Sequence, residues 1–429
     1  MSAMIDRRSF LAFSAAGLVT SAIPLPLLSQ ALSAPPLPDR KLPDAEYWGA
    51  IRKQFAIPEN EIYLNNGTCG STPAPVLKAV FDAFEKEERM EDDNPEQYPL
   101  FGYGPFDQYR EPLARFINAS KDEIAIVRNA TEANAIMANG LDLAPGDEVI
   151  LSDQEHPSGN GPWDMRAKRY GIVIRRVHIP KPATSPDQVL DAIAQAITPR
   201  TKAIFVSHIT TDTGVVLPVK QICALARSKN IVSMIDGAQV AGMMPIDVKD
   251  IGCDMYGSSP HKWLMSPKGS GFLYVRDEMI DRVWSNTTSA GWDDRKSRAA
   301  RFQQYGSSNI PIVAGMVASI DFANQIGLDR IERRGRELSD YALNQMKSRG
   351  IESWTSPDPR MRCAITTYNL APIKIGDMER AMWNEHRIRI RGGAPSKLRL
   401  STPYYLQKQD LDTFFARFDE YRKSPAART

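Results

Sequence analysis

The sequence predicts an α/β protein with a large domain built on a mostly parallel sheet, followed by a smaller α+β domain. Two observations lead to this expectation. The chain has 429 residues with ordinary hydrophobic and charged fractions of 42% and 24%, which is too long for one simple core. From Glu123 onward, apolar β-rich runs alternate with helical stretches, a pattern typical of a helix-covered parallel sheet.

Each predicted strand of the sheet is a short apolar run. The strands are Glu123–Val127, Val149–Leu151, Ile172–Ile179, Lys202–Ser207, Ile231–Asp236 and Gly271–Val275. The helices among them are Thr131–Leu141, Gly161–Tyr170, Gln188–Ala196 and Val219–Lys229. Such sheets bind ligands outside the carboxyl ends of their strands, so polar residues at those ends are the candidates for chemistry.

The pattern changes after Pro311, where a long helical stretch begins. Strands follow around Arg362–Leu370 and Arg387–Arg391, and an amphipathic helix over Lys408–Tyr421 closes the chain. We place a large domain at residues 61–310 and a small domain at residues 311–429. Residues 34–60 are a linker and an N-terminal segment, with an extended stretch over 35–43 and folded structure from about Asp44.

Composition excludes several classes of function. Lys and Arg number 53 against 51 Asp and Glu, so a net charge of +2 would not gather nucleic acid or an anionic membrane surface. The four cysteines lie far apart, without a Cys-x-x-Cys pair or His at zinc spacing, so no metal site is expected. Whether any of them pair in an oxidising compartment stays open. The expected partner is a small molecule.

Residues 1–33 predict an export signal. Asp6–Leu11 contains the pair Arg7-Arg8 and opens an apolar stretch to Leu28, after which small residues offer a cleavage site. The alternative is a membrane anchor, but the stretch is short for a span and is interrupted by Pro24 and Pro26. The twin-arginine route moves folded proteins. We therefore expect an exported, periplasmic protein without a membrane segment once the signal is removed.

Lys262 is the first candidate for chemistry. It lies in the stretch Gly257–Trp263, before the strand Phe272–Val275. Desolvation can keep a lysine in such a loop partly neutral, and its amine can then form an imine with a carbonyl group. Taken alone, a loop lysine is more often a solvated surface charge.

A second candidate group follows the apolar strand Ile231–Ile235 and reads Asp236-Gly237-Ala238-Gln239. A carboxylate at a strand end can pair with the protonated ring nitrogen of a cofactor. Taken alone, an aspartate in this position is more often a helix N-cap. The combination with Lys262 favours the cofactor.

Ser259–Lys262 and Asp236–Gln239 have the forms Ser-x-His-Lys and Asp-x-x-Gln. With Asp-x-x-Gln preceding Ser-x-His-Lys, each after a strand, they resemble the class V aminotransferase and cysteine desulfurase family of fold-type I enzymes, which use pyridoxal 5′-phosphate (PLP). The resemblance runs from Tyr63 to Ser401 and implies the PLP-dependent transferase fold with a seven-stranded type of sheet. Tyr63–Thr68, Glu155–Ser158 and Ser207–Thr210 are most similar to the isopenicillin N epimerase-like branch, which includes exported enzymes.

The resemblance implies a role for each matching residue. Lys262 would hold PLP as a Schiff base and serve as the catalytic base, Asp236 would bind the pyridine nitrogen, and Gln239 would bind the phenolic oxygen. His156 would stack on the pyridine ring, although a histidine after a strand is otherwise most often a hydrogen-bonded loop residue. Arg399 would clamp a substrate α-carboxylate through two parallel hydrogen bonds, the alternative being an exposed strand arginine.

The phosphate of PLP would lie at the start of a helix. Asn129-Ala130-Thr131 opens a helix after a strand, so free N–H groups and the Thr131 hydroxyl point at an anion, although alone this turn is a helix cap. Ser259 and His261 would add donors. Gly306-Ser307-Ser308-Asn309 is similar to a segment that reaches the partner's phosphate, with Ser308 in place of a proline. A homodimer with shared active sites, contacted through Ser307, is therefore expected.

The chain departs from cysteine desulfurases. Those enzymes carry a nucleophilic cysteine shortly before the substrate arginine, where this chain has residues 391–395 without cysteine. Cys69 and Cys363 lie elsewhere, and Thr211 stands where desulfurases usually have asparagine. The resemblance thus implies an aminotransferase or epimerase that acts at the α-carbon of an amino acid or its derivative, with a lyase or a siderophore-tailoring enzyme as alternatives. Epimerisation needs a second acid, for which Tyr103 and His208 are candidates.

A different class of enzyme shares one motif with this chain. Ser259–Lys262 also has the form Ser-x-x-Lys, found in exported acyl-transferases and hydrolases. Those enzymes place the motif near the mature N-terminus and continue with Ser-Asp-Asn and then Lys-Thr-Gly. Here Lys268-Gly269-Ser270 precedes Ser308-Asn309, and no aspartate separates that serine and asparagine. The acyl-transferase is the weaker alternative.

Overall fold

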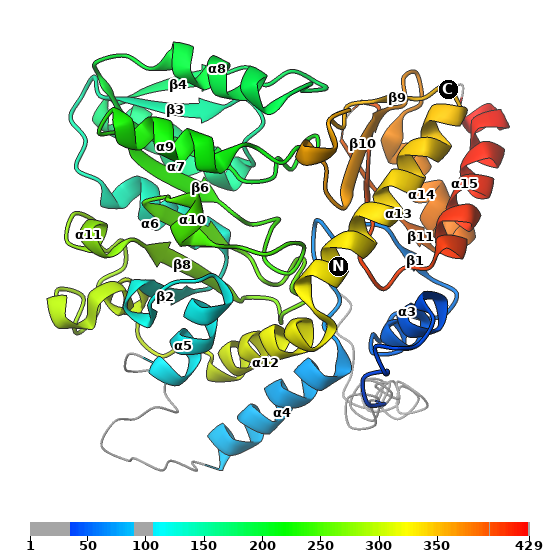
Figure 1. Ribbon diagram of the computed structural model, residues 1–429, viewed down its shortest axis with the longest axis horizontal. Coiled ribbons are helices and arrows are strands. Elements are labelled where there is room, and N and C mark those ends of the chain that lie inside the picture. The colour runs from blue at the N-terminus through cyan, green and yellow to red at the C-terminus, as the bar shows by residue number, and fades with distance from the viewer. Residues whose placement is uncertain (1–34, 90–105, 394, 428–429) are drawn as a thin grey trace, which may run out of the picture.

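The computed structural model describes residues 35–89, 106–393 and 395–427, and its centre is a seven-stranded sheet (Figure 1). The strands are β2 Ile124–Val127, β3 Glu148–Ser152, β4 Val173–Val177, β5 Thr201–Ser207, β6 Val232–Asp236, β7 Met255–Ser258 and β8 Gly271–Val275. Their order is β2-β8-β7-β6-β5-β3-β4. Strand β8 is antiparallel to both neighbours and the other pairs are parallel, so the predicted mostly parallel sheet is confirmed.

Helices cover both faces of this sheet. They are α4 Ala74–Glu88, α5 Asp107–Phe116, α6 Ala130–Gly140, α7 Pro157–Tyr170, α8 Pro186–Ala196, α9 Val219–Ser228, α10 Val248–Ile251 and α11 Asp277–Ile280. In β5, Ile204 and Val206 belong to the core that contains residues of α8 and α9. Ala203 and Phe205 belong to the core that contains residues of α6 and α7. Because side chains alternate along a strand, one apolar run supplies both cores.

The C-terminal part forms a second unit, at the right of Figure 1. Its elements are α13 Leu328–Ser348, β9 Glu352–Ser353, β10 Ile365–Asn369, α14 Ile375–His386, β11 Ile388–Arg389, β12 Arg391–Gly393, β13 Lys397–Ser401 and α15 Lys408–Lys423. A four-stranded antiparallel sheet of order β12-β13-β10-β9 packs with α13 and α14. This arrangement is the predicted α+β unit.

The prediction of one long helix after Pro311 is wrong in one respect, because this stretch forms two helices. Helix α12, Ile310–Ile326, ends at Gly327, which has φ +97°, and α13 leaves at an angle of 77°. Glycine adopts positive φ without steric cost, so the chain turns here. In the described part of the chain, no single helix is long and apolar enough to cross a membrane, whereas this bent pair meets those two requirements together.

The N-terminal segment packs on the C-terminal part. Helix α3, Asp44–Arg52, begins at the predicted residue, and Trp48 packs against Tyr404. Residues 35–43 have neither helix nor strand, but the Arg40 guanidinium donates to the carbonyls of Asn324 (3.0 Å) and Gln325 (2.8 Å). Strand β1, Ile62–Tyr63, pairs in parallel with β11. The domain boundaries at residues 61 and 310 stay predictions, and the signal at residues 1–33 lies outside the described residues.

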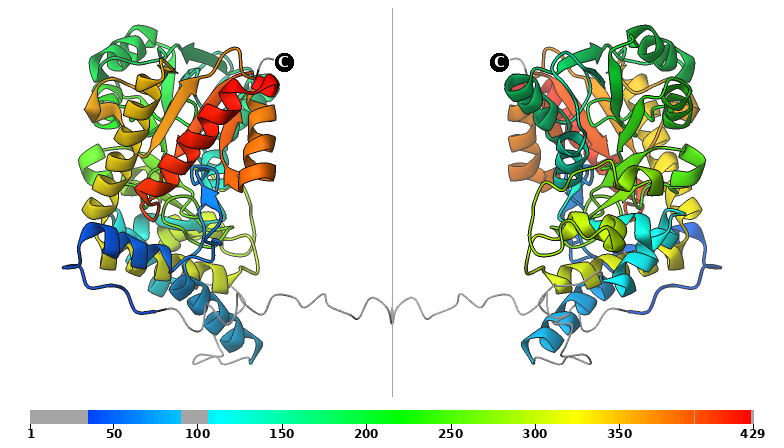
Figure 2. Two further views of the ribbon diagram at one scale, coloured as in Figure 1. Left: turned by 90° about the vertical axis from the view of Figure 1, so that its right-hand side faces the viewer. Right: turned by 90° about the vertical axis from the view of Figure 1, so that its left-hand side faces the viewer.

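Helices α4 and α12 pack along each other at the base of the molecule, below the large sheet (Figures 1 and 2). The carboxyl ends of β2, β3, β5, β6 and β7 all lie at one edge of that sheet, because these strands run in the same direction. Strand β7 was not predicted, since Met255–Ser258 is short and contains a glycine and a serine. Its carboxyl end leads directly into the Lys262 loop.

Candidate active site

A cavity of about 470 Å³ opens at this edge, and the strands β12 and β13 contribute to its wall. Most of the predicted site residues line it, namely Ala130, Thr131, His156, Ser259, His261, Lys262 and Arg399. Asp236 and Gln239 are buried at the same strand ends. Ser307 is exposed and does not line this cavity. The loops at one edge of the large sheet and strand β13 of the C-terminal sheet thus bring together residues that are up to 269 positions apart, from Ala130 to Arg399.

Lys262 is positioned by contacts between its loop and the turn at residues 65–70. Asn66 Nδ2 donates to the Lys262 carbonyl (3.0 Å), and the Gly70 N–H donates to the His261 carbonyl (2.9 Å). A Cβ at position 70 would lie 2.1 Å from the Lys262 carbonyl oxygen, so this approach requires glycine. Burial lowers the pKa of Lys262 to about 8, and the Arg399 charge acts in the same direction. Its amine is therefore partly neutral near neutral pH.

Asp236 ends β6 and is fixed through both carboxylate oxygens. Oδ1 accepts from the Ala238 N–H (2.9 Å), and Oδ2 accepts from Asn134 Nδ2 (2.8 Å). The first bond shapes a turn and does not begin a helix, so the helix-cap alternative is wrong. Asn134, on α6, was missed because its sequence surroundings are those of an ordinary helix.

Both the oxygen and the nitrogen of the Gln239 side-chain amide form hydrogen bonds. Its Oε1 accepts from Trp263 Nε1 (2.7 Å), and its Nε2 donates to the Gly67 carbonyl (2.9 Å) and to Thr211 Oγ1 (2.9 Å). An amide nitrogen has two hydrogens, so a bond to the predicted phenolic oxygen would replace one of these partners. Thr211 thus lines the cavity and also accepts a hydrogen bond from Gln239.

His156 is the N-cap of α7, and its ring is neutral. Nδ1 accepts from the Ser158 N–H (3.1 Å) and lies 2.7 Å from Ser158 Oγ. Burial lowers the pKa of His156, and the Lys262 charge adds to this effect. Since Nδ1 accepts a main-chain hydrogen, the proton of the neutral ring is on Nε2.

The start of α6 forms part of the cavity wall. Asn129 is the N-cap, and its side chain accepts from the Glu132 N–H (3.0 Å). The Ala130 N–H donates to Ser259 Oγ (2.8 Å), which ties the two predicted phosphate-binding segments together. A Cβ at Gly271 would lie 2.5 Å from the Asn129 nitrogen, so β8 starts against this turn. The predicted helix start is confirmed within one residue, with Asn129 as the cap.

Arg399 lies on β13 and is 7% exposed. Its Nη2 donates to Thr68 Oγ1 (2.8 Å) and Asn65 Oδ1 (3.3 Å), and Nη1 donates to the Thr211 carbonyl (3.5 Å). Nε is buried without a hydrogen-bond partner in the described structure. Burial lowers the pKa of this guanidinium to about 10. The side chain is buried and is not the exposed strand arginine of the alternative interpretation.

Sequence reasoning missed the other residues of this wall, which include Thr68, Arg391 and Lys397, and it missed Asp212, which binds Lys397 but does not line the cavity. Asp212 binds both Lys181 and Lys397. Although burial opposes the change, these two hydrogen bonds lower the pKa of Asp212. The alternation in β13 was the available signal, because Leu398 and Leu400 point to the core while Lys397 and Arg399 point to the opposite face.

Several other candidates do not line the cavity or lie outside the described residues. His208 is buried, its Nδ1 lies 3.1 Å from the Tyr256 hydroxyl, and burial lowers its pKa to about 4. Cys363 is buried, Cys69 is partly exposed beside the His261 carbonyl, and the four cysteines are unpaired. Tyr103 lies outside the described residues. Among the described residues, no cluster of His, Cys, Asp or Glu could hold a metal ion.

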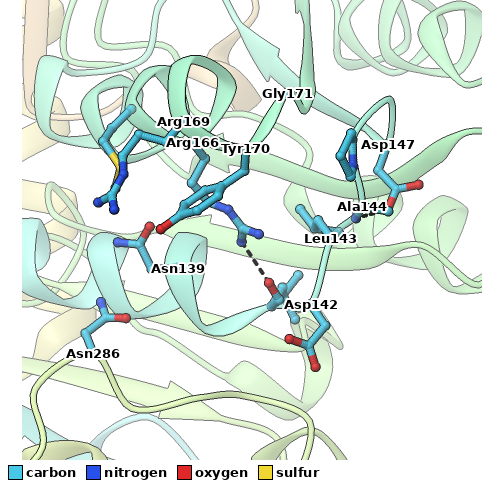
Figure 3. Close-up of a pocket in the computed structure, with 13 residues that line it drawn as sticks. Asn139, Asp142, Leu143, Ala144, Asp147, Arg166, Arg169, Tyr170, Gly171 and Asn286 are labelled. Carbon is cyan, nitrogen blue, oxygen red and sulfur yellow. Dashed lines mark hydrogen bonds between the residues drawn. The ribbon is translucent and has the colours of Figure 1, made fainter.

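A larger cavity, of about 1140 Å³, lies elsewhere, between the ends of α6 and α7 (Figure 3). Arg166 donates to the Leu141 carbonyl there (2.8 Å), and the guanidinium of Arg169 lies over the ring of Tyr170. None of the predicted site residues lines it. Its size alone does not make it the reactive site.

The model of the class V aminotransferase family matches residues 62–414. The chain belongs to this family. Isopenicillin N epimerase of Amycolatopsis lactamdurans is 30% identical to it over 412 residues, covering 88% of this chain and 100% of that protein. A cysteine desulfurase of Yersinia pestis is 31% identical over 339 residues, covering 73% of this chain and 82% of that protein.

Solved structures show the same fold. The apo cysteine desulfurase from Thermococcus onnurineus NA1 has a TM-score of 0.78 at 23% identity, covering 86% of this chain and 96% of that one. A C-DES mutant with glycine covalently linked to its PLP cofactor has a TM-score of 0.77 at 24% identity, covering 85% and 98%. The predicted fold class is confirmed, and PLP is the cofactor of this family. The acyl-transferase alternative is left without support.

The cavity fits PLP. It presents a partly neutral lysine amine, the start of a helix with serine and threonine hydroxyls, and a neutral imidazole. A buried carboxylate, Asp236, ends the central strand, and Arg399 lines the cavity with a guanidinium that forms no ion pair with a described residue. These are the kinds of group that hold an aldehyde, a phosphate, a pyridine ring and a carboxylate.

The lowered pKa of Lys262 predicts at which pH the apo-protein attaches PLP. Only the neutral amine attacks an aldehyde, so the attachment rate should rise with pH and level off above about pH 8. A lysine with the ordinary pKa of 10.5 would still gain reactivity there. The measurement is the rate of borohydride-trapped pyridoxyl label, located by mass spectrometry, from about pH 6 to about pH 10.

Two variants control this experiment. Lys262→Ala should take no label in the cavity, whereas Lys268→Ala, which removes an exposed lysine close by in the chain, should behave like the wild type. A label on another lysine would contradict the assignment of Lys262. A rate that still rises steeply at about pH 10 would contradict the lowered pKa.

Proposed function

We propose that this chain is a PLP-dependent enzyme of the aminotransferase or epimerase type that acts at the α-carbon of an amino acid or its derivative. The observation that carries the proposal is the partly neutral amine of Lys262, which borders the same cavity as the buried Arg399. The 30% identity with an isopenicillin N epimerase over 88% of the chain also supports it. Desulfuration has less support, because the wall at residues 391–393 contains no cysteine.

Each residue has one task in this proposal. Lys262 Nζ would hold the cofactor and, as a free amine, would take the α-proton of the substrate. Asp236 would pair with the pyridine nitrogen, and His156 would lie against the ring. When bound, PLP supplies a ring that takes up negative charge from the α-carbon. Gln239 exchanges its bond to Thr211 for one to the phenolic oxygen.

The remaining groups bind the phosphate of the cofactor and the carboxylate of the substrate. The start of α6, through Ala130 and Thr131, and the side chains of Ser259 and His261 hold the phosphate. Arg399 holds the α-carboxylate of the substrate with its planar guanidinium. The reacting carbon then lies between Arg399 and Lys262.

The described cavity favours transamination over epimerisation. Transamination needs one group that moves the proton on one face, whereas epimerisation needs a second group on the opposite face. Besides Lys262, the titratable side chains of the described wall are two histidines assigned to cofactor binding and the basic residues Arg391, Lys397 and Arg399. Tyr103 is the candidate second acid for an epimerase.

Arg399→Lys should separate substrate binding from cofactor binding. The variant keeps a positive charge but loses the two parallel donors, so catalytic efficiency should fall by about thirty- to a thousand-fold, or about 2 to 4 kcal/mol. The PLP absorbance should not change. The measurement is turnover of an amino acid beside absorbance in the same preparation.

A matched control is Arg334→Lys, since Arg334 is also buried but donates to the Leu406 carbonyl, away from the cavity. This variant should keep full turnover. Loss of absorbance in Arg399→Lys would mean that Arg399 is structural. Unchanged turnover would mean that another group holds the substrate.

We also propose a homodimer in which Ser307 contacts the partner's phosphate, since Ser307 is exposed and outside its own cavity. Ser307→Asp and Lys262→Ala homodimers should both be inactive. Random pairing of the two makes half of the dimers hybrid, each with one intact site, so about a quarter of wild-type activity should return. No recovery after co-refolding, or an active Ser307→Asp homodimer, would contradict shared sites.

We further propose export by the twin-arginine route, on the sequence of residues 1–33. Replacing Arg7 and Arg8 together by lysine should retain the protein in the cytoplasm of a Gram-negative host, whereas Arg40→Lys should leave export unchanged. Fractionation of the two variants beside wild type measures the result. Equal amounts of the double variant and the wild type in the periplasm would contradict this route.

A further inference from the structure

The substrate-facing wall of the cavity contains two arginines directly opposite each other. Strands β12 and β13 are antiparallel, and their register pairs Arg391 with Arg399. Side chains paired in this way leave the sheet on the same face, with Cβ atoms about 5 Å apart. Both residues line the cavity. Like charges in this position destabilise a sheet unless an anion lies between or beside them.

Neither arginine forms an ion pair within the described residues, although the Asp212 charge acts on Arg399 and Arg391 is exposed. The hydrogen bonds of Arg399 go to the uncharged Thr68, Asn65 and Thr211, and its buried Nε has no partner. The guanidinium of Arg391 forms no ion pair or side-chain hydrogen bond with any residue that the structure describes. The Arg391 charge further lowers the pKa of Arg399, after the effect of burial.

The third cation of this wall is already neutralised. Lys397 pairs with Asp212, which Lys181 also binds. A Cβ at Gly393 would lie 2.4 Å from Lys397 Cε, so glycine at this position lets the lysine cross β12. The Asp212 carboxylate is thereby occupied by two lysines, and Arg391 and Arg399 remain for a ligand.

We propose that the substrate has two anionic groups and that Arg391 binds the one that Arg399 does not. The inference rests on the proposed function, in which Arg399 holds the α-carboxylate. It specifies the substrate class as amino acids with a carboxylate, or an equivalent anion, on the side chain. A monocarboxylic amino acid would leave Arg391 facing Arg399 without a second counter-charge. Arg391 is in this sense a residue that determines specificity.

The test is equilibrium binding to the PLP-loaded full chain, without turnover. Dissociation constants are measured by calorimetry for the dicarboxylates succinate, glutarate and adipate and for the monocarboxylates butyrate and valerate. The best dicarboxylate should bind about five- to thirty-fold more tightly than either monocarboxylate. Arg391→Gln should remove this preference and leave monocarboxylate binding unchanged, and Arg391→Lys should retain part of it.

The matched control is Arg389→Gln. Arg389 is an exposed arginine two residues away, its guanidinium lies 3.8 Å from the ring centroid of Trp383, and it does not line the cavity. The Arg389→Gln variant loses the same charge near the site and should keep the wild-type preference for dicarboxylates. An equal loss in both variants would assign the preference to net charge and overturn the proposal.

Two further outcomes would overturn it. Equal affinity for mono- and dicarboxylates in the wild type would mean that Arg391 does not bind a second carboxylate. Equal weakening of both classes in Arg391→Gln would mean that Arg391 and Arg399 share a single carboxylate. The proposed function fails separately, if the pyridoxyl label is on a residue other than Lys262 or if no turnover is found, and neither result is read from these binding constants.

Discussion

The site depends on one contact region, the turn at residues 65–70, which touches both sides of the cavity. Gly70 packs on the Lys262 carbonyl, and Gly67 packs on the Arg399 guanidinium, where an added Cβ would lie 3.5 Å from its central carbon. The preceding Leu64 carbonyl accepts from the Ser401 N–H (3.0 Å), which ties the turn to β13. One short segment therefore sets the distance between the lysine of the large sheet and the arginine of the C-terminal sheet.

Burial of cations is the second constraint. Lys262 and Arg399 have lowered pKa values because burial disfavours their charged forms; the Arg399 charge adds to this effect at Lys262, and the Arg391 charge adds to it at Arg399. Asp236 offsets part of this effect at Lys262, while Asn134 and the Ala238 N–H hold its carboxylate in place. Burial without an ion pair lets the amine of an active-site lysine act as a base, and it leaves a buried arginine available to bind an anion.

Much of this fold could be predicted from the sequence, because the buried strands are continuous apolar runs and their ends carry polar residues. Asp236 and His156 were found in this way, whereas Lys262 follows β7, which was not predicted, and was found from the motif around it. Gly327 inside an otherwise helical stretch did not mark the bend between α12 and α13, since a lone glycine is tolerated in helices. The β1–β11 pair could not be predicted either, because each strand is only two residues long and the pairing spans the whole chain.

The wall of the cavity was harder to predict for a different reason. Arg391 and Lys397 acquire their positions from strand register, and a one-residue shift would move each to the other face. The Asp212 interaction with Lys181 and Lys397 decides which cation is left for a ligand, and no local pattern links these three residues. Sequence reasoning could name the arginine that matched a family motif, but not its neighbour across the sheet.

These constraints together define where a substrate must lie. The cofactor end of the cavity comes from the loops of the large sheet, whereas Arg391 and Arg399 come from the C-terminal sheet. A molecule that reaches Lys262 with its amine and Arg399 with its carboxylate therefore bridges the two units across the turn at 65–70. Its α-carbon is positioned by both units at once, so a change of register in β12 or β13 would alter the choice of substrate while the residues around Lys262 stay in place.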